Sequence, residues 1–432
     1  MHCILIILFS FLATATAAGT GHFPRRPAQN SSAPLAYACG PTTANITCVN
    51  RYASFLPATF SRDPDPSIGY TGTKVPDDPS WKLVQNADFV LFDKKRGLEV
   101  LGRAPKITRG IISWLNAIHE APVFVPELNV LFVAQDGLPG NKSILKLDLS
   151  HDPPTVSPIE TDPPIYQPTG GLYNPKDGMV YLAVHGKNSS LPQHAGLARF
   201  DPKTLKAEWL LNNYHGFNFA GPNDLTLDPL TGDIWFTDTD YAYVIGVSDA
   251  PKQLQLATWR FRPSTGQVQI VDTSLQYPNG IQFSHDGATL YVADSGLENY
   301  SPVATRGAGD FYNYPLYIQF NSTGARTVFA WDVGRRGSQK HPVITGKRAI
   351  FQSLEGAPDG LKVARNGYLV IAGGLAPGVD ITDEFGNQIA RIQTSHPVEN
   401  IQWSGDDCKT LWLVGISGIT KVEFDLSGPK LK

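Results

Sequence analysis

Four oxygen-bearing residues stand at matching places in separate parts of the chain. Glu120, Asn223, Asn279 and Asp359 each precede a short apolar run, and three of them lie in Pro-Asn-Asp, Pro-Asn-Gly and Pro-Asp-Gly triplets. Carboxylate and amide oxygens are the ligands that hard divalent cations prefer. Two carboxylates gathered in a desolvated pocket cannot both stay ionised without such a cation. If the fold brings these residues together, they predict a site for Ca²⁺, with Mg²⁺ or Mn²⁺ as alternatives.

The same triplets also have a structural interpretation. Asn-Gly, Asn-Asp and Asp-Gly pairs form turns, because their side chains bond to nearby backbone and tolerate positive φ. One such pair alone indicates a turn, whereas three in register with a Glu in the first position favour an ion site. Asn400 stands at the corresponding place in a last segment, and we expect it to contact a bound substrate.

A repeat predicts how these distant residues meet. Each copy has a small-residue turn, an alternating strand, a polar turn and a second apolar strand, and the copies begin near Ala117, Pro168, Gly221, Tyr277, Ala357 and Pro397. Most spacings match a four-stranded propeller blade, and the longest one implies an insertion near residues 297–350. We therefore predict an all-β, six-bladed β-propeller over residues 86–432, with a β-sandwich as the alternative. A strand at 88–93 is expected to close the ring by pairing with the last strands, 409–414 and 421–424.

The N-terminal region predicts an exported protein. A mostly apolar run, Cys3–Leu12, is followed by small residues, which is typical of a signal peptide over residues 1–18. Residues 19–85 are rich in Pro, Ser, Thr and Asn and predict an extended arm or a loose subdomain. Six Asn-x-Ser/Thr sequons support a secreted glycoprotein: Asn30, Asn45, Asn141, Asn188, Asn299 and Asn321.

Cysteine content and charge indicate the redox compartment and the kinds of partner. An oxidising compartment favours a local Cys39–Cys48 disulfide, and the alternative ties the arm to the propeller through Cys408. The formal net charge of −3 gives no electrostatic reason to expect nucleic acid or an anionic membrane as a partner. After the N-terminal run, no segment approaches 18 consecutive apolar residues, so a membrane span is not expected.

The quoted segments resemble the SMP-30/gluconolactonase family, and more closely its secreted fungal lactonohydrolases. The resemblance covers roughly residues 85–426 and is most specific in Pro222-Asn-Asp-Leu-Thr-Leu-Asp228, Tyr277-Pro-Asn-Gly280 and Ala357-Pro-Asp-Gly-Leu361. It implies that Glu120, Asn279 and Asp359 hold the metal, with Asn223 beside the metal and the substrate. Two departures are Glu120-Ala-Pro122 in place of Glu-Gly-Pro, and Gly221 where some members carry an Arg that contacts a sugar.

The resemblance also implies a reaction: hydrolysis of a small lactone, such as an aldonolactone, to its hydroxy acid. Asp359, or else Asp224, is expected to take a proton from the attacking water, and His119 or His185 is an alternative base. Asn223, His119 and Asn400 are expected to contact the substrate. A cyclase or isomerase of secondary metabolism, or a non-enzymatic propeller that binds carbohydrate or protein, remains an alternative. A serine hydrolase is disfavoured because the chain has no Gly-x-Ser-x-Gly elbow.

Overall fold

The computed structural model divides the chain into two units, Met1–Pro34 and Leu35–Lys432. It describes residues 33–63, 69–112, 118–136, 144–186, 193–244, 248, 251–300, 318–321, 323–337 and 340–430. The predicted signal peptide, residues 1–18, and the side chain of His119 lie outside the described residues. The fold below is that of the second unit.

Five antiparallel sheets of four strands each make up most of the described structure. The first contains β5 (Ile118–Val125), β6 (Val130–Asp136), β7 (Ile144–Asp148) and β8 (Thr155–Ile159). The second contains β9 (Pro168–Asn174), β10 (Met179–Val184), β11 (Gly196–Phe200) and β12 (Ala207–Leu211). The third contains β13 (Pro222–Leu227), β14 (Ile234–Asp238), β15 (Ala257–Arg262) and β16 (Gln267–Asp272). The fourth contains β17 (Pro278–Phe283), β18 (Thr289–Asp294), β21 (Thr327–Arg336) and β22 (His341–Gln352). The fifth contains β27 (Asn400–Ser404), β28 (Thr410–Gly415), β29 (Gly418–Glu423) and β4 (Lys106–Ile112).

The prediction of six four-stranded blades is wrong, because the described structure has five. The remaining copy of the repeat belongs to a seven-stranded sheet in the order β1-β2-β3-β26-β25-β24-β23. Its strands are β1 (Ala36–Ala38), β2 (Ile46–Val49), β3 (Phe89–Leu91), β26 (Gln388–Ile392), β25 (Val379–Thr382), β24 (Leu369–Ala372) and β23 (Leu361–Val363). The N-terminal segment extends this sheet by laying β3 antiparallel along the free edge of β26, which an unpaired edge strand invites.

The predicted extended arm and the predicted ring closure are therefore both corrected. The described part of residues 33–85 is folded: β1 pairs with β2, β2 runs parallel to β3, and the predicted Cys39–Cys48 disulfide is formed. Cys408 is a buried free thiol. The strand at 88–93 pairs with β26 rather than with the last strands, and it is β4 that pairs with β29.

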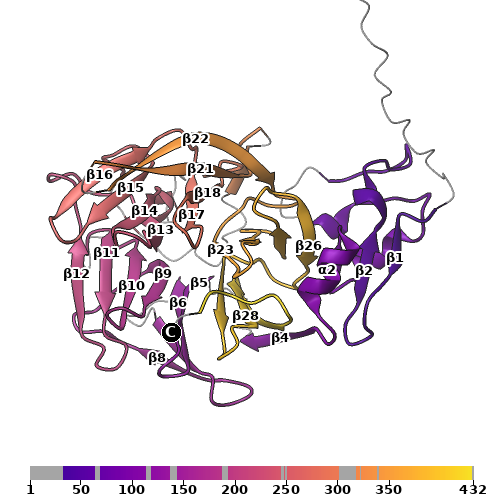
Figure 1. Ribbon diagram of the computed structural model, residues 1–432, viewed down its shortest axis with the longest axis horizontal. Coiled ribbons are helices and arrows are strands. Elements are labelled where there is room, and N and C mark those ends of the chain that lie inside the picture. Colours follow the sequence, from indigo (N-terminus) through magenta and orange to yellow (C-terminus); the bar gives the residue numbers. More distant parts are fainter. Residues whose placement is uncertain are drawn as a thin grey trace, which may run out of the picture. The chain divides into compact units, whose positions relative to one another are not determined.

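The first strands of the sheets meet around a common centre (Figure 1). Contacts run in a closed cycle from β5 to β9, β13, β17, β23, β27 and back to β5. The starts of neighbouring first strands approach each other closely, as Gly170 approaches Asn223 and Gly280 approaches Asp359, so these starts lie at one end of the central channel. The sequence-predicted site residues stand at those starts.

Burial follows strand position within each sheet. Second strands such as β14 and β24 are buried at every residue, because both of their faces pack on neighbouring sheets. Continuous apolar runs are typical of strands covered on both sides, and each fully buried Leu, Ile or Val contributes about 1.5–3 kcal/mol. Outer strands such as β8 and β16 are largely exposed. The first strands β13 and β17, which carry site residues, are also buried at all but one residue each.

Helices are short. They are the 3₁₀ turns Asn50–Ala53 and Tyr70–Gly72, and the α-helices α1 (Trp81–Gln85), α2 (Lys94–Leu101) and α3 (Tyr241–Val244). The insertion predicted near 297–350 contains a small hairpin of β19 (Glu298–Tyr300) and β20 (Ile318–Phe320) and the long β21–β22 hairpin. Among the described residues, no helix has the length and apolarity needed to cross a bilayer.

Candidate active site

Three first strands are bulged at the predicted site residues. The pairing of β5 with β6 skips from Glu120 to Val123, so that two residues of β5 oppose one of β6. The pairing of β13 with β14 skips from Pro222 to Leu225, and the pairing of β17 with β18 skips in the same way from Pro278. A bulge breaks the alternation of a strand and re-aims a side chain. Asn223 and Asn279 each lie inside such a bulge, and Glu120 lies at the edge of one.

Buried carboxylates hold two of these bulges in place. Asp238 at the end of β14 accepts the backbone N–H groups of Ala220 and Gly221, at 3.1 and 2.8 Å. Asp294 at the end of β18 accepts the N–H groups of Gln276 and Tyr277 in the same manner. Burial raises the pKa of Asp238 to about 7. These Asp residues, which end the second strands, therefore fix the chain just before Pro-Asn.

Asn279 and Asp359 are joined through Ser295. The Ser295 hydroxyl accepts from Asn279 Nδ2 at 3.1 Å and donates to the carbonyl of Pro358 at 2.7 Å. Gly280 is required beside them, because a Cβ there would lie 2.2 Å from the Asp359 carbonyl oxygen. Asn279 Oδ1 takes no part in this chain of bonds.

Three buried carboxylates form the centre of the site. Glu120, Asp359 and Glu399, called the acidic cluster below, offer oxygens that all lie within 4.8 Å of one another. Their exposed fractions are 7%, 5% and 7%. Burial, and then the negative charge of Glu399, raises the pKa of Glu120 and of Asp359 well above the ordinary values. Burial also raises the pKa of Glu399, against a hydrogen bond with Asp359 that lowers it.

Glu399 is the residue that sequence reasoning missed. The sixth copy reads Pro397-Val-Glu-Asn400, with two residues between Pro and Asn where the third and fourth copies have none. The pairing of β27 with β28 is regular from Asn400 onward, so no bulge shifts the register there. Glu399 lies just ahead of the strand and joins the cluster, whereas the Asn400 side chain hydrogen-bonds Glu120 and accepts from the Ile401 N–H at 2.9 Å. The extra acidic residue before Asn400 was the available indication.

The other predicted residues have different surroundings. Asp224 is 1% exposed, and its carboxylate accepts the N–H groups of Leu225 and Ile281, at 2.8 and 3.4 Å. Burial raises the pKa of Asp224, and the positive charge of Lys362 opposes that shift. Asn223 is buried, and its carbonyl accepts from the Thr169 hydroxyl at 2.9 Å.

The acidic cluster suits a hard divalent cation. Its ligand atoms are all oxygens, and mutual repulsion between buried carboxylates makes the fully ionised cluster unfavourable by itself. Among the described residues no Lys or Arg forms an ion pair with Glu120, Asp359 or Glu399. A bound cation would remove this conflict, and Asn279 would add a neutral oxygen.

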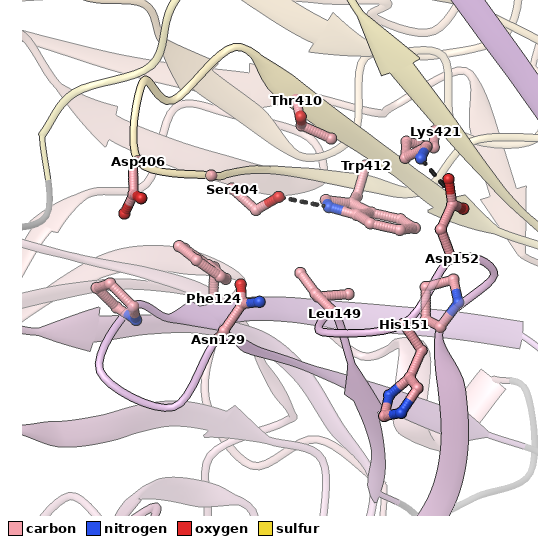
Figure 2. Close-up of a pocket in the computed structure, with 13 residues that line it drawn as sticks. Phe124, Asn129, Leu149, His151, Asp152, Ser404, Asp406, Thr410, Trp412 and Lys421 are labelled. Atoms are coloured by element: carbon pink, nitrogen blue, oxygen red, sulfur yellow. Dashed lines mark hydrogen bonds and ion pairs between the residues drawn. The ribbon is translucent and has the colours of Figure 1, made fainter.

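A second hollow lies at the other ends of the same strands. Figure 2 shows a pocket of about 540 Å³ between the β5–β8 sheet and the β27–β29–β4 sheet. Phe124, which lines it, is roughly 13 Å along β5 from Glu120 at about 3.3 Å per residue. Lys421 and the exposed Asp152, both in its lining, form an ion pair at 3.5 Å, and among the described residues the acidic cluster is the one group of three ligating side chains close enough to hold an ion. The acidic cluster is therefore the candidate active site.

This fold and site define a class of protein: propeller-like sheets around a channel whose mouth holds buried carboxylates. Comparison with known proteins gives the family. The family model described as the SMP-30/Gluconolactonase/LRE-like region matches residues 167–417. Lactonohydrolase oryL of Aspergillus oryzae is 37% identical over 89% of this chain and 86% of its own. The chain therefore belongs to the SMP-30/gluconolactonase family.

Solved structures agree with this fold. A gluconolactonase from Xanthomonas campestris has a TM-score of 0.58 at 20% identity, covering 78% of this chain and 94% of its own. Regucalcin from Agrobacterium tumefaciens, a calcium-binding protein, has a TM-score of 0.51 at 15% identity, covering 74% of this chain and 95% of its own. At these identities the similarity concerns the fold alone.

Proposed function

We propose that this protein is a metal-dependent lactonase that opens a small lactone to its hydroxy acid. The observation that carries the proposal is the acidic cluster, three buried carboxylates that have no positively charged side chain to pair with among the described residues. Support for the reaction comes from the fungal relative, which is named a lactonohydrolase and aligns along most of both chains.

The ion is proposed to be calcium, with Mg²⁺ or Mn²⁺ as alternatives. Glu120, Asp359, Glu399 and Asn279 would hold it, with Asn223 nearby. Calcium accepts six to eight oxygen ligands in flexible geometry, which suits donors taken from several strands. When bound, such an ion polarises a carbonyl and stabilises the negative charge that develops on its oxygen. The naming of regucalcin as a calcium-binding protein is consistent with this choice.

The residues of the chain supply the proton transfer. Asp359 is proposed to take a proton from the attacking water, because its carboxylate lies in the acidic cluster beside the place proposed for the ion. Asp224 is the second candidate, but its oxygens accept two backbone N–H groups. Water oxygen bonds to the carbonyl carbon, the ring C–O bond breaks, and the leaving oxygen takes a proton. The product ionises, so one proton is released per turnover at neutral pH.

The proposed place of action is outside the cytosol. The Cys39–Cys48 disulfide is consistent with an oxidising compartment. The apolar N-terminal run and the six sequons are consistent with a secreted glycoprotein.

The test is acid release in a pH-stat from glucono-δ-lactone and from an aromatic lactone. We expect release that stops when a chelator removes the ion and returns when calcium is added. The surface variant Asp332→Asn, whose side chain is 65% exposed, is the matched control and should behave as the wild type. Full activity after exhaustive chelation would overturn the metal dependence, and no release from any lactone would overturn the reaction.

A further inference from the structure

His185 is a buried imidazole that the fold does not use. It is 3% exposed, and neither ring nitrogen has a hydrogen-bond partner in the described structure. Burial lowers its pKa to about 3. The ring is therefore neutral near pH 7 and offers one N–H donor and one acceptor lone pair. Leaving such groups unpaired costs about 1–3 kcal/mol, so a residue of this kind calls for a partner.

Strand register places His185 at the mouth of the channel. In three sheets the residue after the second strand donates its backbone N–H to a carbonyl oxygen. The acceptor belongs to the residue before the proline that begins the first strand. The pairs are His185 to Gln167, Thr239 to Gly221 and Ser295 to Tyr277. His185 is thus the counterpart of Ser295, whose side chain bonds Asn279 and the carbonyl of Pro358, next to Asp359. The position of His185 in its own sheet corresponds to one that reaches the site directly.

The His185 ring also contacts the next first strand. A Cβ on Gly221 would lie 3.1 Å from His185 Cδ2, which is tighter than an ordinary contact, so a glycine allows the ring to sit there. Gly221 precedes Pro222 and Asn223, and the Thr169 hydroxyl bonds to the carbonyls of both of these residues. The imidazole therefore lies beside the segment that carries Asn223 into the site.

We propose that His185 hydrogen-bonds a hydroxyl group of the lactone and makes the enzyme selective for hydroxylated lactones. A hydroxyl group both donates and accepts, which matches a neutral imidazole, whereas a carboxylate would leave the lone pair unpaired. A site built to pair with a substrate hydroxyl discriminates against the analogue that lacks it, because its own polar atoms are then left unpaired. This inference rests on the proposed lactonase function.

The experiment compares lactones that differ in their hydroxyl groups: glucono-δ-lactone with δ-valerolactone, and 6-hydroxydihydrocoumarin with dihydrocoumarin. His185→Phe keeps an aromatic ring and removes both polar atoms. We expect it to lower kcat/KM for the hydroxylated member of a pair by about tenfold or more, mainly through KM. The unhydroxylated member should change less than about twofold. His185→Asn, which restores a donor and an acceptor, should recover part of the loss.

Controls separate this role from others. His151→Phe changes a histidine whose side chain is 60% exposed and lies at the far ends of the strands. It should leave kcat/KM unchanged for both members of each lactone pair. Thermal melting and calcium titration of each variant measure folding and the ion site directly. Equal loss on both members of a pair, or no loss on either, would overturn the inference while leaving the lactonase function standing. Wild-type inactivity on all four lactones would instead overturn the proposed function, and this inference with it.

Discussion

Two groups of buried carboxylates in the same fold differ in whether a positively charged side chain pairs with them. Near the seven-stranded sheet, Glu355 and Asp380 share the guanidinium of Arg391, with Arg391 Nη1 2.8 Å from Asp380 Oδ1 and all three side chains at most 1% exposed. We call these three residues the Arg391 cluster. At the channel mouth the acidic cluster is almost as buried but has no guanidinium or ammonium partner among the described residues. The carboxylates of the Arg391 cluster have their own cation, whereas those of the acidic cluster leave that place to a ligand.

The largest effect is expected from a change in the acidic cluster. Asp359→Asn removes a proposed ligand and the proposed base, and we expect kcat/KM for any accepted lactone to fall about 10⁴-fold, or about 5.4 kcal/mol. Calcium affinity measured by titration calorimetry should fall as well. Asp332→Asn is the control for the loss of a carboxylate. Retained activity together with retained calcium affinity would exclude Asp359 from both roles.

The next largest effect should come from the Arg391 cluster. Arg391→Met leaves two buried carboxylates without a cation, and breaking a buried ion pair in this way costs about 3–5 kcal/mol of unfolding free energy. Arg348→Met is the matched control, because Arg348 pairs with Asp332 at the surface and such pairs contribute about 0–1 kcal/mol. Urea unfolding at saturating calcium measures both. Equal losses in the two variants would mean that burial does not distinguish these pairs.

A smaller effect is expected in the stability of the folded protein when calcium and pH are varied. Because the pKa values of the acidic cluster are raised, the calcium-free folded state binds more protons than the unfolded state above the ordinary carboxyl range. Its stability therefore falls as pH rises from that range toward the raised values. Calcium should remove this loss, so the gain in melting temperature on adding calcium should grow with pH.

Calcium at a hundredfold excess over its Kd raises the free energy of unfolding by about 2.7 kcal/mol. Melting curves at pH 5, 6, 7 and 8, with and without calcium, give the slope. Glu399→Gln should flatten the calcium-free slope because it removes one coupled carboxyl group. A calcium effect that shrinks as pH rises would contradict this account of the cluster.

Local patterns in the sequence were sufficient for much of the site. Asn279 and Asp359 stand at the starts of first strands, where Pro-Asn-Gly leads into a bulge and Pro-Asp-Gly into a turn, and Glu120 stands at the edge of a bulge in β5. Glu120 and Asp359 were expected to meet, and they do. Glu399 was missed because its copy has an altered spacing after Pro397, so that matching by triplet selected Asn400 instead.

The partner of β3 could not be predicted from local sequence patterns. Whether β3 pairs with β26 or β28 depends on which edge is free in the folded molecule, and the partners are about 300 residues apart in either case. Residues 19–85 have a composition typical of an extended segment, but the described part gains order from the edge of β26. Pairing across such distances is set by the packed sheets and not by local residue preference.

The contact between Tyr70 and Glu355 links the N-terminal segment to the catalytic end of the molecule. The backbone N–H of Tyr70 donates to the carboxylate of Glu355, which also binds Arg391 and lies only four residues before Asp359. Removal of the leading segment would take away this backbone donor and leave Arg391 as the partner of the carboxylate, four residues before Asp359. We therefore expect turnover to depend on the leading segment, although none of its described residues belongs to the acidic cluster.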